Sequence, residues 1–303
     1  MFELKLKFKK KRNWQTSVFL FCMMAIPFFF GVIFDIYMKL QTVSFMFRDE
    51  MGTKFGFFYI NWAFEQLVTP TSGVFYALKH FFLIFLFFNF VCMPLQVGMS
   101  YFFVKKIPGT MFYRIIFYAP NLISQVITAI VFRTMMDSTY GPVTEILRVV
   151  GVQVPTLGWF NAPDTAFPAL MFYYLWISFG TSTMIYTAAI NKLPPEIFEA
   201  GRLDGVSMWR ELIYIVFPMI SPILSVGFLS NTTAGFNIYA EVLLFTDPSL
   251  SNLYTVAYLI TEGARKRDYY HAAGIGFVFT LIAVPIVSGL RWAFDKFLPD
   301  VSY

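Results

Sequence analysis

The feature that most constrains this chain is a set of six long apolar stretches. A helix needs about 20 apolar residues to cross the roughly 30 Å hydrocarbon core of a bilayer. Only 14% of the 303 residues are charged and 57% are hydrophobic, whereas soluble domains carry about 25% charged residues. We therefore predict an all-α, polytopic membrane protein with about six transmembrane helices, at about 17–38, 78–104, 111–134, 167–191, 217–245 and 271–292.

The distribution of Lys and Arg predicts the orientation of these helices. Cytoplasmic loops of membrane proteins are enriched in Lys and Arg. The first 16 residues are strongly basic, through Lys5, Lys7, Lys9, Lys10, Lys11 and Arg12. We expect this segment to be cytoplasmic and the first apolar stretch to be retained as a span. Residues 17–303 then form a single transmembrane domain, with both termini and the loop at about 192–217 on the cytoplasmic side.

Several classes of chemistry have no motif in this sequence. It contains no phosphate-binding GxxxxGK[ST] pattern, no HExxH zinc pattern and no GxSxG nucleophile elbow. The two cysteines, Cys22 and Cys92, lie in apolar runs, and the two histidines, His80 and His271, are far apart. The segments between the predicted spans are also too short for a catalytic domain. We therefore predict no enzymatic activity, no metal site and no nucleic-acid partner.

The segment EAGRLDGVSMWRELIYIVFP, residues 199–218, is charged although it lies between two apolar stretches. Pro195 is favoured in the first turn of a helix. Glu196 and Glu199 are also favoured near the start of a helix, because that end of the helix dipole is positive. Gly201 and Gly205 lie four residues apart, so we expect them on one face, and Gly205 can end the helix in a left-handed turn. One interpretation is an ordinary interfacial helix.

The same segment resembles the cytoplasmic loop of ABC-importer membrane subunits. That loop reads Glu-Ala-Ala, three residues, Gly, nine residues, then Ile-x-Leu-Pro. This chain keeps the spacing but has Gly201 in place of Ala and Phe217 in place of Leu. In that family the short helix docks into an ATPase subunit. The resemblance implies a coupling function for Glu199, Ala200, Gly201, Asp204, Gly205 and Pro218. It also implies that ATP and Mg bind a partner ATPase dimer, with no cofactor in this chain.

Flanking residues resemble the carbohydrate-uptake branch of these importers, over roughly 75–303. The similar positions are Trp176, Tyr186, Ala188, Leu193, Pro194 and Glu196 around the fourth span, the DGVSMW sequence at 204–209, and Tyr140, Gly141, Leu147, Gly151 and Trp159 in the preceding loop. Thr144 stands where Asn is usual, and Phe132 where Trp is common. The chain looks like the larger maltose-type subunit without its inserted domain. The resemblance implies a bacterial inner-membrane heterodimer with a second permease subunit and an extracytoplasmic solute-binding protein.

Polar residues within the predicted spans are candidates for a saccharide pathway, because sugars bind to aromatic faces and hydrogen-bonding side chains. We select Trp176, Ser178, Thr181, Asn231, Gly235, Asn237 and Glu241. In a continuous helix, Asn231 and Gly235 share one stripe, which the resemblance places toward the pore. The alternative is hydrogen bonding between helices, which we favour for Asn121, Gln125 and Thr128 in the third span.

Two other functional classes were weighed against a sugar importer. A self-sufficient secondary carrier or channel predicts intramembrane charges or paired broken helices. A membrane-embedded enzyme requires a catalytic cluster. The sequence favours neither. Its last outer loop carries Arg265, Lys266 and Arg267, which makes an acidic saccharide one candidate substrate. A binding-protein surface or a simply solvated loop would also explain these cations.

Overall fold

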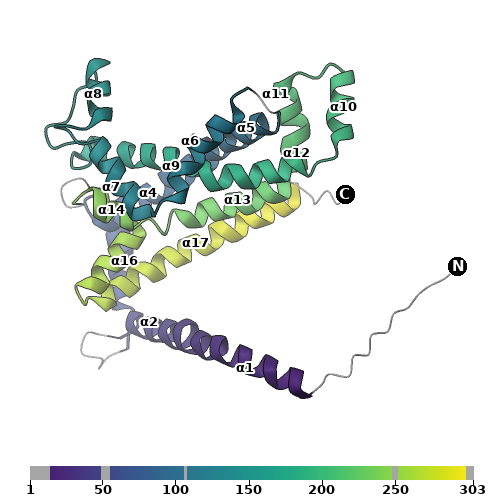
Figure 1. The fold of residues 1–303 in the computed structure, drawn as a ribbon. Helices are drawn as coiled ribbons and strands as arrows, with labels where there is room; N and C mark the ends of the chain where they lie inside the picture. Colours follow the sequence, from purple (N-terminus) through teal and green to yellow (C-terminus); the bar gives the residue numbers. More distant parts are fainter. Residues whose placement is uncertain (1–13, 49–54, 106–107, 248–251, 298–303) are drawn as a thin grey trace. The chain divides into compact units, whose positions relative to one another are not determined.

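The computed structural model of the protein describes residues 14–48, 55–105, 108–247 and 252–297 (Figure 1). The basic segment predicted to be cytoplasmic therefore lies almost wholly outside the described residues. Across the described ranges every regular element is a helix, and the β-type pairing is one isolated bridge between Arg48 and Phe55. The chain divides into two compact units, which meet in sequence between Phe58 and Tyr59. The prediction of a single domain over 17–303 stays a prediction.

The first unit is built around one long apolar helix. Helix α1 (Trp14–Phe30) continues through a π-helical turn, η1 (Gly31–Tyr37), into α2 (Met38–Met46). The apolar helix is thus longer than the predicted 17–38. Lys39 and Asp35 form an exposed ion pair one turn apart, with 3.0 Å between Nζ and Oδ1. The large apolar side chains of α1 are exposed, as expected for a helix whose surroundings are lipid or another chain.

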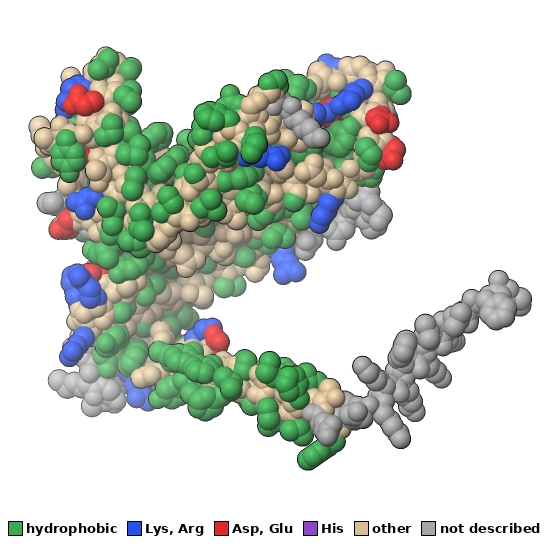
Figure 2. All heavy atoms as spheres, in the orientation of Figure 1, with side chains coloured by type: hydrophobic (Ala, Val, Ile, Leu, Met, Phe, Trp, Pro, Cys, Tyr) green, Lys and Arg blue, Asp and Glu red, His purple; other side chains and the backbone are tan. Residues whose placement is uncertain are grey.

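The second unit is organised around three long helices. Helix α4 (Gly73–Phe87), η2 (Phe88–Cys92) and α5 (Met93–Val104) form one continuous helix, preceded by α3 (Phe58–Val68). Helix α9 (Pro163–Asn191) packs along α5, and α17 (Tyr269–Phe297) packs along α16 (Val256–Arg265) and α13 (Ser221–Ala234) (Figure 1). Figure 2 shows hydrophobic side chains over the middle of this unit, with most of the charged groups toward its two ends.

Two of the predicted spans are broken rather than straight. Helix α6 (Thr110–Leu122) and α7 (Gln125–Met135) meet at a bend of 110°, where Ile123 is extended. Likewise α11 (Met208–Glu211), η3 (Leu212–Val216) and α12 (Phe217–Met219) meet α13 at 80°. Pro222 in the first turn of α13 explains the second bend, because proline disfavours helical backbone just before it.

The fifth predicted span, 217–245, is interrupted a second time. Helix α13 ends at Ala234, and α14 (Ala240–Phe245) begins only after five residues without regular helix. A single helix over 217–245 was therefore a wrong prediction. Within the described residues, three helices are long and apolar enough to cross a membrane, or up to five if each bent pair is one span. Helix α9 has 29 residues but is not among them, since polar residues interrupt it, so the count of six spans stays a prediction.

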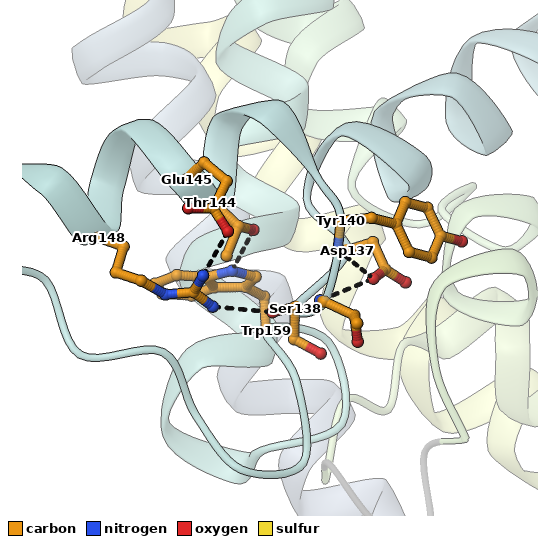
Figure 3. Close-up of polar contacts among 8 residues, drawn as sticks. Asp137, Ser138, Tyr140, Thr144, Glu145, Arg148 and Trp159 are labelled. Atoms are coloured by element: carbon orange, nitrogen blue, oxygen red, sulfur yellow. Dashed lines mark hydrogen bonds and ion pairs between the residues drawn. The ribbon is translucent and has the colours of Figure 1, made fainter.

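A compact loop between α7 and α9 carries the short helix α8 (Pro142–Val149) (Figure 3). The buried Trp159 indole donates a hydrogen bond to the Thr144 hydroxyl at 2.8 Å, and Arg148 donates to the Ser138 carbonyl at 3.1 Å. The Asp137 carboxylate accepts two backbone N–H groups in the turn before α8. Two residues singled out by the family resemblance, Thr144 and Trp159, thus bond directly to each other.

Candidate functional site

The predicted short helix in the charged loop is present as α10 (Pro195–Leu203). It begins at Pro195 and ends where Gly205 adopts a φ of 70°. The Gly205 N–H donates to the Arg202 carbonyl at 3.1 Å, and the Val206 N–H donates to the Gly201 carbonyl at 2.9 Å. These two bonds form a Schellman motif, the left-handed helix end for which glycine is favoured. Both the helix and its glycine stop were predictable from the sequence.

One side of α10 is open and carries most of the predicted coupling residues. Glu199, Ala200 and Asp204 are exposed, and Leu203 is 89% exposed, which is unusual for a large apolar side chain. A Cβ added at Gly205 would meet nothing within 4 Å. Such an apolar, open surface beside acidic groups is suited to contact with another protein.

Two other predicted coupling residues lie away from that open surface. Gly201 is buried, and a Cβ at that position would lie 3.5 Å from the Ile215 side chain. The expectation that Gly201 and Gly205 present one small-residue face is therefore corrected: Gly201 packs against its own chain. Pro218 is exposed in α12, outside α10.

A cavity of about 610 Å³ lies among α5, α6, α7, α9, α13 and α14. Of the residues predicted to line a saccharide pathway, the cavity is lined by Ser178, Thr181, Asn231, Asn237 and Glu241. The structure thus brings together side chains from α9, α13, α14 and the irregular segment between the last two. Amide and hydroxyl groups on several elements converge here, as in many small-molecule sites.

Trp176 and Gly235 do not line this cavity. The Trp176 ring stacks on Phe132, with 5.8 Å between ring centres, within the aromatic core that also contains Tyr173 and Phe245. A Cβ at Gly235 would lie 3.4 Å from the Phe81 and Ile84 side chains. Trp176 therefore has a packing role in this structure, and Gly235 faces side chains of α4 rather than the cavity.

Both irregular backbone segments reach the same cavity. Ile123 belongs to the break between α6 and α7, and Asn237 and Ile238 belong to the break between α13 and α14. Within a membrane, non-helical backbone is tolerated where it is buried in protein or lines a polar cavity, because its amides need partners. Both breaks lie at one polar cavity, where non-helical backbone is tolerated. This shared position supports the cavity as a functional feature.

The lining includes residues that the sequence analysis assigned to helix–helix hydrogen bonding and others that it did not single out. The third span contributes Asn121 and Gln125, and other elements contribute Gln96, Cys92 and Tyr174. Asn121 donates to the Ile177 carbonyl at 2.8 Å, so the predicted helix–helix hydrogen bonding is real. The same residue also faces the cavity. The polar spacing in the third span was the available signal.

Glu241 dominates the electrostatics of the cavity. Among the described lining residues it alone carries a charged side chain. It is 1% exposed, and its carboxylate accepts a hydrogen bond from the Gln125 amide. A buried carboxylate is costly unless it is hydrogen-bonded, which accounts for the contact across two broken spans. The described residues contain no group of three side chains able to hold a metal ion.

The cations of the last predicted outer loop are partly compensated locally. Arg265 and Lys266 lie 2.8 Å and 3.3 Å from the same Glu262 carboxylate oxygen, and His271 lies 2.8 Å from Asp268. The hydrogen bond from Arg265 lowers the pKa of Glu262. Arg267 has a φ of 64°, a left-handed position that most side chains rarely adopt. These pairs reduce the field that the three cations could project.

Comparison with known proteins identifies what the chain is similar to. No family model matches it. It is 25% identical over 177 residues to a probable ABC transporter permease, YurN, of Bacillus subtilis, covering 58% of this chain and 61% of that protein. It is 24% identical over 278 residues to a probable ABC transporter permease, PH1215, of Pyrococcus horikoshii, covering 90% and 92%. The chain is a relative of ABC transporter permeases.

The name of a third relative includes a sugar. The diacetylchitobiose uptake permease NgcF of Streptomyces coelicolor is 26% identical over 185 residues, which cover 60% of this chain and 52% of that protein. The aligned segments thus span only half to about three fifths of NgcF and YurN.

Comparison with solved structures confirms the predicted fold of the chain. A chain of a bacterial ABC transporter that imports the acidic polysaccharide alginate superimposes with a TM-score of 0.77 at 19% identity, covering 93% of this chain and 97% of that one. A second alginate transporter structure, in complex with a periplasmic protein that binds an alginate pentasaccharide, gives a TM-score of 0.73 at 18% identity, covering 95% and 99%. The predicted all-α, polytopic membrane fold is confirmed.

Proposed function

We propose that this chain is one membrane subunit of an ATP-driven, binding-protein-dependent importer of saccharides. The observation that carries the proposal is α10, with its Schellman end at Gly205 and its exposed Leu203. In ABC importers the helix with this sequence pattern is the contact with the ATPase. ATP hydrolysis and Mg binding then belong to a separate ATPase dimer, and this subunit is not an enzyme.

The substrate class is supported by the cavity and by the names of the relatives. Amides, hydroxyls and the Tyr174 ring supply the hydrogen bonds and aromatic surface that sugars use. Relatives are named for diacetylchitobiose, for arabinooligosaccharides and for lactose. The structural neighbours are transporters of alginate, an acidic polysaccharide. Sugars or oligosaccharides are therefore the proposed class, and acidic members are included as candidates.

This assignment implies partner subunits and a location in the cell. We propose a heterodimer with a second permease subunit, an extracytoplasmic solute-binding protein, and insertion in the bacterial inner membrane with both termini cytoplasmic. The alternative is a self-sufficient secondary carrier or channel. Glu241 is the kind of buried carboxylate that such a carrier would use, and it is the observation that keeps the alternative open.

The composition of the native complex tests the proposal. The chain is tagged, extracted in mild detergent and purified, and the co-purifying proteins are identified by mass spectrometry. We expect an ABC ATPase and a second permease in stoichiometric amounts. A chain that is pure and folded but has neither partner would contradict the importer assignment and favour the carrier. A variant with Leu203→Asp is the matched control, because it should lose the ATPase and keep the second permease.

A further inference from the structure

The cytoplasmic end of α5 carries a buried ion pair that sequence reasoning did not anticipate. Lys105 and Glu211 lie with 2.5 Å between Nζ and Oε1, and their side chains are only 16% and 4% exposed. Glu211 ends α11, and Lys105 directly follows α5. A buried charge pair contributes little net stability to a folded protein. Removal of one partner is strongly destabilising, because the other charge then stays buried without a partner.

Lys105 also contacts the proposed coupling helix. Its ammonium lies 5.0 Å from the centre of the Phe198 ring on α10 and 5.2 Å from the Tyr101 ring on α5. These distances are within the range of cation–π attraction. One turn before Lys105, the Phe102 ring meets Trp209 of α11 edge to face, with 5.9 Å between ring centres. One ammonium group therefore joins α5, α10 and α11.

The other end of this connection is the cavity. Cys92 and Gln96 line the cavity, and both belong to the continuous helix Gly73–Val104, which Lys105 directly follows. Gln96 donates a hydrogen bond to the Ser178 carbonyl on α9 at 3.2 Å, and Ser178 is also a lining residue. A displacement of α10 that moved Lys105 would thus act on a rigid helix whose next turns form the cavity wall.

We propose that Lys105 is a positioning residue that couples α10 and α11 to the cavity through its contact with the Phe198 ring and its ion pair with Glu211. The proposal rests on the proposed importer function. The pair holds α10 and α11 as one body against α5, so that movement of an ATPase bound to α10 is transmitted to Cys92 and Gln96 rather than absorbed in the loop. Charge, and not volume alone, is the property that this role requires.

The test compares substitutions that change charge with substitutions that keep it. Lys105→Met removes the ammonium and retains an apolar stem, and Lys105→Arg keeps a cation. The double variant Lys105→Glu with Glu211→Lys reverses the pair. Lys192→Met is the matched control, because Lys192 is exposed at the end of α9. Each variant is purified as the complete transporter, and ATP hydrolysis is measured with and without the substrate-loaded binding protein.

We expect Lys105→Met to lower the stimulation of ATP hydrolysis by about twofold to thirtyfold. Mutations between coupled sites change the coupling free energy by about 0.5–2 kcal/mol, and about 1.4 kcal/mol corresponds to a factor of ten. Lys105→Arg should restore most of the stimulation. The reversed pair keeps the ion pair but loses the cation at the Phe198 ring, so it should restore part of the stimulation, and Lys192→Met should leave it unchanged. Wild-type stimulation in Lys105→Met would overturn the proposal. So would a loss of stimulation, or of assembly, that neither charge-preserving variant restores, because packing alone would then explain it.

A second readout separates this proposal from the importer assignment. Amide hydrogen exchange across 195–205 can be followed in the purified chain without any ATPase. We expect faster exchange in Lys105→Met and exchange close to wild type in Lys105→Arg, which keeps a cation near the Phe198 ring. Equal exchange in Lys105→Met and wild type would contradict the positioning role. A wild-type chain that never binds an ATPase would instead contradict the proposed function and leave this exchange result to decide the positioning role.

Discussion

At the scale of single residues, Gly205 and Thr144 show how local geometry limits substitution. Gly205 has a φ of 70° and open space around its missing Cβ. Thr144 is buried and accepts the hydrogen bond of the Trp159 indole. The first residue is constrained by backbone conformation and the second by a hydrogen bond, so each has a different diagnostic substitution.

Gly205→Trp should block the proposed docking surface of α10. Gly205→Ala is the matched control, because it carries the same left-handed strain, about 1–2 kcal/mol, without the bulk of an indole. We expect the Trp variant to lose ATP-driven transport and stimulated ATP hydrolysis at normal abundance, and the Ala variant to keep most of both. Normal transport by Gly205→Trp would show that this surface is not the ATPase contact.

Thr144→Val should destabilise the loop that carries α8. The substitution keeps the shape of the side chain but removes the acceptor of the Trp159 N–H, which then stays buried without a partner. An unsatisfied buried donor costs about 1–3 kcal/mol. Thermal unfolding of the purified protein should therefore begin at a lower temperature in Thr144→Val, whereas Thr144→Ser should stay near wild type. Equal unfolding of the two variants would contradict a role for this hydrogen bond.

At the scale of elements, the helical content, α10 and the bend before α13, where Pro222 stands, were predictable from the sequence, but the second break of the fifth span was not predicted. Pro195, the acidic first turn and Gly205 are local signals, and local signals decide where a short helix begins and ends. The unwound segment 235–239 does carry Gly235 directly after α13, a residue typical of helix ends, but placing Asn231 and Gly235 on one stripe assumed a continuous helix. The Lys105–Glu211 pair joins residues far apart in the chain, so no local pattern predicts it.

The orientation of the elements is tested by labelling single cysteines in intact cells. In a background with Cys22→Ser and Cys92→Ala, one cysteine is placed at Ser207, after α10, or at Thr139, before α8; both positions are exposed. From the distribution of Lys and Arg we expect an impermeant reagent to label Thr139→Cys from outside and Ser207→Cys only after the cells are opened. Reversed labelling at either position would overturn the predicted topology.

At the scale of the whole molecule, the net charge of +5 and the cations near α16 raise the question of an acidic substrate. Long-range attraction to exposed charges falls off beyond about 8–10 Å at physiological salt. Glu262 and Asp268 already compensate part of this cluster, and the described lining of the cavity contains the Glu241 carboxyl group and no basic side chain. Any steering of acidic glycans is therefore expected from Arg265, Lys266 and Arg267, in the last predicted outer loop.

Neutralising the outer cations tests that steering. The variant carries Arg265→Gln, Lys266→Gln and Arg267→Asn, the last because Asn tolerates the left-handed backbone. If acidic glycans are substrates, we expect slower uptake of an acidic glycan at low salt, a smaller defect at high salt, and unchanged uptake of a neutral glycan. Uptake of the acidic glycan at the parental rate in low salt would mean that the cluster is a solvated loop.

The central claim, that this chain forms the pathway of an ATP-driven saccharide importer, is tested most directly by uptake into proteoliposomes. Vesicles contain the purified complex, with ATP inside, and receive a labelled glycan with or without the solute-binding protein. The account predicts that accumulation requires both ATP and the binding protein, and that it is lost in Gly205→Trp vesicles. Uptake by this chain alone, without ATP or binding protein, would contradict the account and identify a self-sufficient carrier or channel.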